Sequence, residues 1–202
     1  MSVIYYRPQV LETIARQTLC KYDCGYLNQE PAAVPIEMII ENTFQLTIEY
    51  QYLTNNAREL GRMIYDSGIT TYYDQDLGDY ALMRVQAGTM LIDASLLINE
   101  LYGRLRFTLA HELAHYIIHK GIFCGTGVAA ALYDNNADED MMEWQANYLA
   151  RAMLMPNGQV KRCFYKSRSS CRCESEFVKR LASIFEVSKQ AMKIRLKDFG
   201  LI

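Results

Sequence analysis

The stretch that decides the fold runs from Arg104 to Lys120 and reads R-L-R-F-T-L-A-H-E-L-A-H-Y-I-I-H-K. It contains the motif H-E-x-x-H, formed by His111, Glu112 and His115. On a helix, residues four apart share one face and lie about 6 Å apart along the axis. Two imidazoles at this spacing can bind one zinc ion, and the intervening Glu112 can act as a general base toward water.

The residues around the motif predict a buried helix with one narrow polar face. At about 100° per residue, the polar side chains fall within a sector of about 100°. These side chains are Arg104, Thr108, His111, Glu112, His115 and His119. The other directions are apolar except for Arg106 and Lys120, which indicates burial with the polar sector facing a cleft. The alternatives are a chance motif on an exposed helix or histidines satisfied within a core, and the context favours a metal site.

Composition limits the class of protein. The chain has 202 residues, half of them apolar, which fits one domain or one domain with a small appendage. A formal net charge of −2 argues against a protein that mainly coats nucleic acid. No run of about 18 apolar residues and no signal-like start is found, so we expect a cytoplasmic protein without a membrane segment.

The six cysteines are expected to be free thiols in a reducing compartment. Cys20 with Cys24, and Cys171 with Cys173, raise the alternative of a second zinc site. Their spacings differ from the usual C-x-x-C pairs, and no histidine remains to complete a ligand set. We therefore expect one metal ion.

Periodicity predicts an α+β fold in which a small antiparallel or mixed sheet packs on helices. Helices are expected at 8–24 and 36–42, and strands at 46–53, 61–65, 69–73, 80–86 and 89–93. Ala87-Gly88 reads as a hairpin turn between the last two strands. For the motif helix, Asn99 is the candidate N-cap and Gly121 the C-terminal stop. Residues 121–135 are expected to form a loop near the site.

A second helix is expected from Asn136, where Asn136 and Glu139 resemble a capping box, to about Leu154. A catalytic zinc usually takes three protein ligands. His119 lies about 12 Å from His111 along the axis, too far to share one ion, and no other histidine exists. The third ligand is therefore expected to be a carboxylate of this second helix. Spacing leaves Glu139 and Glu143 open, and the capping explanation of Glu139 favours Glu143.

Two segments carry a family resemblance. R-F-T-L-A-H-E-L-A-H-Y-I-I-H (Arg106–His119) and E-W-Q-A-N-Y-L-A-R-A-M-L-M-P (Glu143–Pro156) resemble the ImmA/IrrE family of zinc metallopeptidases. That family pairs R-F-T-x-A-H-E-x-G-H with E-x-x-A-N-x-F-A-x-x-L-L-M-P, and the similarity extends over about residues 30–202. The chain departs from the pattern at Ala114, where the family usually has glycine, and at Tyr148-Leu149.

The resemblance implies a zincin-like domain over residues 1–160 and a C-terminal appendage over 161–202. It implies zinc ligation by His111, His115 and Glu143, with Glu112 as the catalytic base. It also implies a protein substrate, typically a helix-turn-helix repressor of a mobile element or stress operon. Asn147 is a candidate for orienting a ligand. An oxyanion donor is expected, but fifteen tyrosines do not single one out.

The C-terminal quarter supports an alternative function. Residues 157–173 hold five basic side chains and no acidic one, and they read as a mobile solvated loop or as a docking site for an acidic partner. The five are Lys161, Arg162, Lys166, Arg168 and Arg172. Residues 177–186 and 188–198, with Ser188 as a cap, form either a DNA-binding helix-turn-helix or a hairpin packed on the domain. The competing class is thus a DNA-binding or partner-binding regulator with a structural or inactive zinc site.

Overall fold

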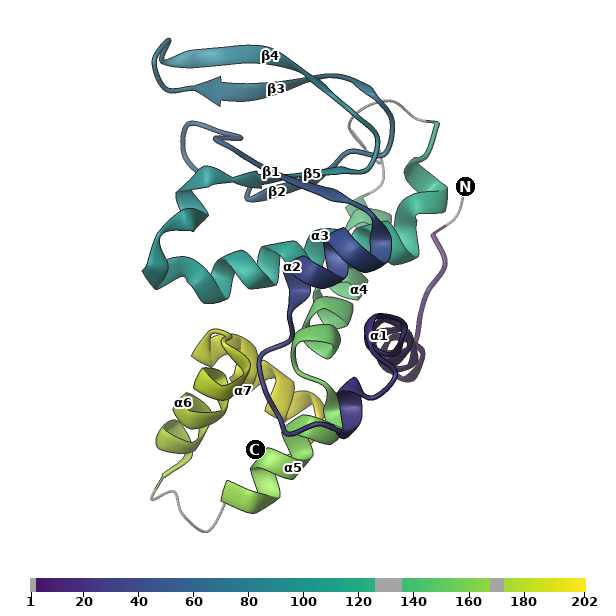
Figure 1. Cartoon of the computed structure of the whole chain (residues 1–202), viewed down its shortest axis with the longest axis vertical. Helices are drawn as coiled ribbons and strands as arrows, with labels where there is room; N and C mark the ends of the chain where they lie inside the picture. The colour runs from purple at the N-terminus through teal and green to yellow at the C-terminus, as the bar shows by residue number, and fades with distance from the viewer. Residues whose placement is uncertain (1–2, 126–135, 168–172) are drawn as a thin grey trace.

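A computed structural model describes residues 3–125, 136–167 and 173–202 and has the expected α+β architecture (Figure 1). Its helices are α1 (Pro8–Tyr22), α2 (Ile36–Met38), α3 (Tyr102–Phe123), α4 (Asn136–Leu154), α5 (Asn157–Ser167), α6 (Glu174–Phe185) and α7 (Lys189–Asp198). Its strands are β1 (Thr47–Gln51), β2 (Gly61–Met63), β3 (Gly68–Asp74), β4 (Asp79–Val85) and β5 (Thr89–Asp93). Short 3-10 turns occur at Tyr26–Asn28, Ala94–Leu97 and Asn99–Leu101, and a π-helical turn at Ile39–Thr43 follows α2.

The strands form a mixed three-stranded sheet and a separate two-stranded hairpin. In the sheet, β5 lies at the centre, parallel to β1 and antiparallel to β2. All five residues of β5 are buried, as a central strand requires. Strands β3 and β4 pair only with each other among the described strands, and Figure 1 shows them on the side of the sheet away from α3.

The predicted hairpin between 80–86 and 89–93 is wrong. A turn does occur at Ala87-Gly88, but β4 pairs with β3 and β5 pairs with β1 and β2. The alternating, half-exposed β4 suits a two-stranded hairpin, whereas the fully buried β5 needs a strand on each edge. The turn therefore moves the chain from the hairpin into the sheet.

Helix α3 lies beneath the sheet and contacts β2 and β5 on one side and α4 on the other (Figure 1). Most of its apolar surface is buried as predicted, including Leu105, Leu109 and Leu113, whereas Phe107, Ile117 and Ile118 are half-buried. The buried Arg106, which interrupts the apolar surface, donates to the Val34 carbonyl at 2.7 Å and lies 3.9 Å from the Glu186 carboxylate, while its Nε has no partner among the described residues. The polar sector divides: four of its members line a cleft, while Arg104 is exposed and His119 is buried.

Both predicted ends of α3 are wrong by a few residues. The helix begins at Tyr102 after the 3-10 turn that contains Asn99, and its N-cap residue is Leu101. It continues past Gly121 to Phe123, because Phe123 packs against Tyr65 with ring centroids 5.1 Å apart. The chain then turns at Gly125, which has a φ of 83° and donates its N–H to Asp66. The rest of the predicted 121–135 loop lies outside the described residues.

Helix α4 begins and ends where predicted and packs between α3 and α1. A buried ion pair joins α1 to α7 beside it. The guanidinium of Arg195, 0% exposed, binds both carboxylate oxygens of Glu12 at 2.5 and 3.1 Å and donates to the Met155 carbonyl at 3.0 Å. These contacts link the C-terminal hairpin to the helices that support the site.

The mobile loop predicted for 157–173 is wrong over its first part, because α5 occupies Asn157–Ser167. Its buried residues Val160, Cys163 and Phe164 repeat at helical spacing. Arg162 donates to the carbonyls of Leu27 and Gln29, at 2.9 and 2.8 Å, and so is used within the fold. Arg168 and Arg172 lie outside the described residues.

Helices α6 and α7 form the predicted C-terminal hairpin. The Ser188 hydroxyl caps α7 by accepting from the Ala191 N–H at 3.0 Å. The apolar residues of the pair, such as Phe185 and Leu196, are buried. The predicted division of the chain at residue 160 falls inside α5 and stays a prediction. No described helix combines the length and apolar character needed to cross a bilayer.

Candidate metal centre

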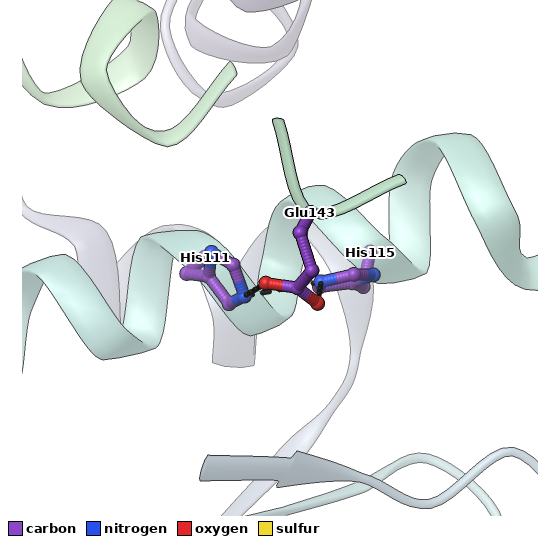
Figure 2. A group of neighbouring side chains, drawn as sticks. All are labelled: His111, His115 and Glu143. Carbon is purple, nitrogen blue, oxygen red and sulfur yellow. Dashed lines mark hydrogen bonds and ion pairs between the residues drawn. The ribbon is translucent and has the colours of Figure 1, made fainter. Parts of the chain in front are cut away.

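Three donor side chains converge between α3 and α4. Nε2 of His111 and Nε2 of His115, one helical turn apart on α3, lie 3.0 Å from each other. The Glu143 carboxylate reaches across from α4, with Oε2 3.3 Å from His111 and Oε1 3.1 Å from His115. Figure 2 shows the carboxylate between the two rings. All the donor atoms lie within 4.8 Å of one another. Among the described residues, this is the one group of three His, Cys, Asp or Glu side chains that could hold a metal ion.

The geometry and chemistry of this donor set fit a zinc ion. Tetrahedral zinc with bonds of about 2.0–2.1 Å separates its ligand atoms by about 3.3 Å. The observed separations of 3.0, 3.1 and 3.3 Å are close to that value. Two imidazoles and one carboxylate also form a ligand set of catalytic zinc sites, which keep a fourth position open. The residues present can therefore hold the metal that the motif implies.

The predicted base, Glu112, lies beside this cluster and against strand β2. Its side chain is buried, with 8% exposed. A Cβ added to Gly61 would lie 2.7 Å from Glu112 Oε1 and 2.8 Å from its Cγ. Because residue 61 has no side chain, the Glu112 side chain can occupy the space beside it. Glycine also allows β2 to come closer to the motif face of α3 at this point than any other residue would.

The charges of the cluster are coupled. Burial would raise the pKa of Glu143, but hydrogen bonds from His111 and His115 hold it well below its usual range. Burial lowers the pKa of His111, but the Glu143 hydrogen bond and the charges of Glu112 and Glu143 outweigh it and raise the pKa. Burial raises the pKa of Glu112. The Glu143 carboxylate therefore stays ionised beside the two imidazoles, as a metal ligand must.

His119 does not join the donor cluster, as the distance along the helix predicts. It is 1% exposed, and its Nδ1 lies 3.1 Å from Nδ1 of His115. Burial, followed by the neighbouring His115, lowers the pKa of His119 to about 4, so the ring is neutral near pH 7. His119 thus contacts the nitrogen of His115 that faces away from the donor cluster.

The cluster opens into a cleft of about 850 Å³ between β2, the β3–β4 hairpin, α3 and α4. Of the described residues that line this cleft, Tyr65 is the one tyrosine. It is 7% exposed, and its buried hydroxyl has no hydrogen-bond partner among the described residues. Burial and the nearby Glu112 raise its pKa, so the hydroxyl keeps its proton. Sequence reasoning expected a donor and could not choose one; no sequence signal marks Tyr65.

The other residues that the sequence offered for the site differ in whether they line the cleft or join the donor cluster. Glu139 lines the cleft but lies outside the donor cluster, whereas Glu143 lies within it. Asn147 also lines the cleft, and its amide contributes to the raised pKa of His111. Cys20, Cys24 and Cys173 are free, and no described cysteine belongs to a metal-binding group. Cys171 lies outside the described residues.

Fold and site together define a class: α+β proteins whose long buried helix carries H-E-x-x-H and whose next helix supplies a carboxylate, as in zinc metallopeptidases. The profile of the IrrE N-terminal-like domain family matches residues 66–197, more than half of the chain. The chain therefore belongs to this metallopeptidase family, which confirms the ImmA/IrrE resemblance.

Comparison with solved structures shows the same fold in a Mycobacterium tuberculosis transcriptional regulator. The two share 16% sequence identity and superpose with a TM-score of 0.53. The match covers 92% of this chain and 46% of the regulator, so the chain spans less than half of that protein's length. No curated protein sequence matches significantly.

Proposed function

We propose that this protein is a zinc-dependent metallopeptidase that hydrolyses a peptide bond in a protein substrate. One observation carries the proposal: the donor atoms of His111, His115 and Glu143 lie within 4.8 Å of one another, beside the buried carboxylate of Glu112 in a large cleft. A structural zinc site has no need of an adjacent unligated carboxylate or of an open cleft.

The residues of the site divide the work. When bound by His111, His115 and Glu143, zinc supplies a Lewis acid that acidifies water and polarises a carbonyl. Glu112 accepts the proton of the attacking water and returns it to the leaving amine, which is general base and then general acid catalysis. Burial raises the pKa of Glu112 and makes its carboxylate a stronger base. The Tyr65 hydroxyl is the candidate donor to the oxyanion.

Strand β2 gives the substrate a place to bind. It is one of the two edge strands of the three-stranded sheet, and all three of its residues line the cleft. An extended peptide adds to such an edge through main-chain hydrogen bonds. Arg62 of this strand is held by Glu59 and Thr70, each contact 2.6 Å, so the edge is fixed before a substrate arrives. A cleft of this form suits an unfolded or extended segment of a protein.

The substrate class that we propose is a helix-turn-helix transcriptional repressor of a mobile element or stress operon, cleaved in the cytoplasm. Support for this comes from the family resemblance of the paired motifs. The related fold found in a protein named as a transcriptional regulator is compatible with a regulatory setting, although 16% identity carries only the fold.

The test combines metal analysis with cleavage of the repressor encoded by a neighbouring gene. The purified protein is expected to hold one zinc ion per chain and to cut the repressor, with fragments read by mass spectrometry. Glu112→Gln is expected to keep zinc and lose cleavage, and Glu143→Gln to lose zinc. Glu139→Gln, on the same helix four residues before Glu143, is the matched control for metal binding and should keep zinc. Cleavage that survives in zinc-loaded Glu112→Gln would show that the proposed base is wrong.

A further inference from the structure

Buried polar groups continue behind His115, on the side away from the cleft. His119 of α3 and Gln145 of α4 are 1% and 0% exposed, and His119 contacts His115 directly. Two of their atoms, His119 Nε2 and Gln145 Oε1, have no hydrogen-bond partner of ordinary geometry among the described residues. Because a buried polar atom without a partner gives up its hydration for nothing in return, the presence of two such atoms side by side needs a reason.

Proton placement follows from the role of His115. Its Nε2 points at His111 and Glu143, so this nitrogen must be free of hydrogen when it ligates a metal. The hydrogen of a neutral imidazole is then on Nδ1, which can only donate. The atom 3.1 Å away is Nδ1 of His119, which must accept and therefore carries its own hydrogen on Nε2.

Gln145 supplies the complementary atom. The amide nitrogen of Gln145 donates to the Ile4 carbonyl at 3.1 Å, which leaves the amide oxygen as the free end. The Gln145 side chain is also within interaction distance of His119. The two unpartnered atoms are thus one donor, His119 Nε2–H, and one acceptor, Gln145 Oε1. They are therefore chemically complementary.

We propose that His119 and Gln145 are positioning residues that orient His115 for metal binding through a relay of hydrogen bonds. The relay runs from His115 Nδ1 to His119 and on to Gln145 Oε1, and the N-terminal segment at Ile4 anchors its far end. It fixes both the tautomer and the ring orientation of His115. The inference rests on the proposed metal centre and gives His119, too distant for direct ligation, a defined task.

The expected size follows from other metal sites, where loss of a group that orients a histidine ligand weakens metal binding about 10- to 100-fold. His119→Phe keeps a ring but removes the acceptor and is expected to weaken zinc binding by about that factor. His119→Asn can place its amide oxygen near the former Nδ1, so a smaller loss, below about 10-fold, is expected. Gln145→Leu should cost about 10-fold and also serves as the test if phenylalanine at 119 prevents folding.

The experiment uses the full chain and two metals. The zinc dissociation constant is measured by competition with a chelating indicator, and the visible absorption of the Co²⁺-loaded protein reports ligand geometry. Circular dichroism and thermal unfolding of the metal-free protein measure folding separately. The double variant His119→Phe/Gln145→Leu should bind zinc no more weakly than His119→Phe, because groups that act through one another are not additive.

Leu109→Ala is the matched control. Leu109 is a fully buried residue of the same helix and is not part of the cleft, so its truncation destabilises the fold without touching the relay. It should keep the zinc dissociation constant and the Co²⁺ spectrum of the wild type. Wild-type zinc affinity in folded His119→Phe, or an equal loss in Leu109→Ala, would overturn the relay. A wild-type chain that binds no zinc would instead count against the proposed metal centre.

Discussion

Replacement of Gly61 by alanine is expected to lower the proposed peptidase activity and to leave zinc binding unchanged. Gly61 belongs to β2, and an added Cβ would lie 2.7 Å from Glu112 Oε1, 2.8 Å from its Cγ and 2.9 Å from Thr108 Cγ2. Real Cβ atoms essentially never make contacts under 3.0 Å, so the neighbouring side chains must move. The flexible group among them is the carboxylate of Glu112, which is the proposed base.

The size of the effect follows from these distances. Ordinary contact begins at 3.4 Å, so Glu112 has to retreat by about 0.7 Å from the 2.7 Å position. Misplacement of a catalytic group by about 1 Å costs about 100-fold in rate, so a loss of about 10- to 100-fold in kcat is expected. Overpacking costs about 1–3 kcal/mol of stability. The ligands His111 and His115 lie outside these contacts, so zinc binding should persist.

The assay compares kcat for peptide cleavage, zinc content and thermal unfolding of wild type and Gly61→Ala. Gly121→Ala is the control, since Gly121 lies on α3 itself and an added Cβ would meet nothing within 4 Å. It should retain full activity and gain slightly in stability. If zinc-loaded Gly61→Ala cleaves substrate at the wild-type rate, the approach of β2 does not determine the position of Glu112.

Three further outcomes are expected. Tyr65→Phe should lower kcat about 100- to 1,000-fold at unchanged zinc content if its hydroxyl stabilises the oxyanion, and an unchanged kcat would exclude it. Arg195→Met should lower the free energy of unfolding by about 3 kcal/mol, because it leaves Glu12 partly buried without its partner, and Arg195→Met/Glu12→Gln should recover part of this in urea titrations. A gel shift with duplex DNA at two salt concentrations should show no specific binding; a specific complex would favour the competing regulatory function.

The two helices that carry the site could be predicted from sequence because their signals are local. The H-E-x-x-H spacing, the apolar surround and the acidic first turn of α4 each depend on residues within one element. Distance along the axis also excluded His119 as a ligand. Spacing alone left Glu139 and Glu143 open, since residues four apart share a face. The capping role of Glu139 favoured Glu143, the family resemblance agreed, and the structure brings Glu143 into the donor cluster.

The features that could not be predicted from the sequence are mostly contacts between segments far apart in the chain. The turn at Gly88 is real, but whether β4 pairs forward with β5 or back with β3 depends on which edges the rest of the fold leaves free. The roles of Gly61 and Tyr65 likewise arise only where β2 meets α3, about fifty positions later in the chain. Helix α5 is different: Val160, Cys163 and Phe164 carried a helical signal, which the basic residues between them obscured.

Different parts of the fold control metal binding and the position of the proposed base, two properties that are often hard to separate in variants of metalloenzymes. Metal affinity depends on the α3–α4 pair, because the histidines come from one helix and Glu143 and Gln145 from the other. The position of the base depends on β2, because the Glu112 side chain packs against Gly61, where an added Cβ would lie 2.7 Å from its Oε1. Variants at the α3–α4 contact should therefore change zinc dissociation first and activity in proportion. Variants of β2 should change kcat at constant zinc content. The ratio of the loss in zinc affinity to the loss in kcat therefore shows whether a substitution acts through the α4 side or the β2 side of α3.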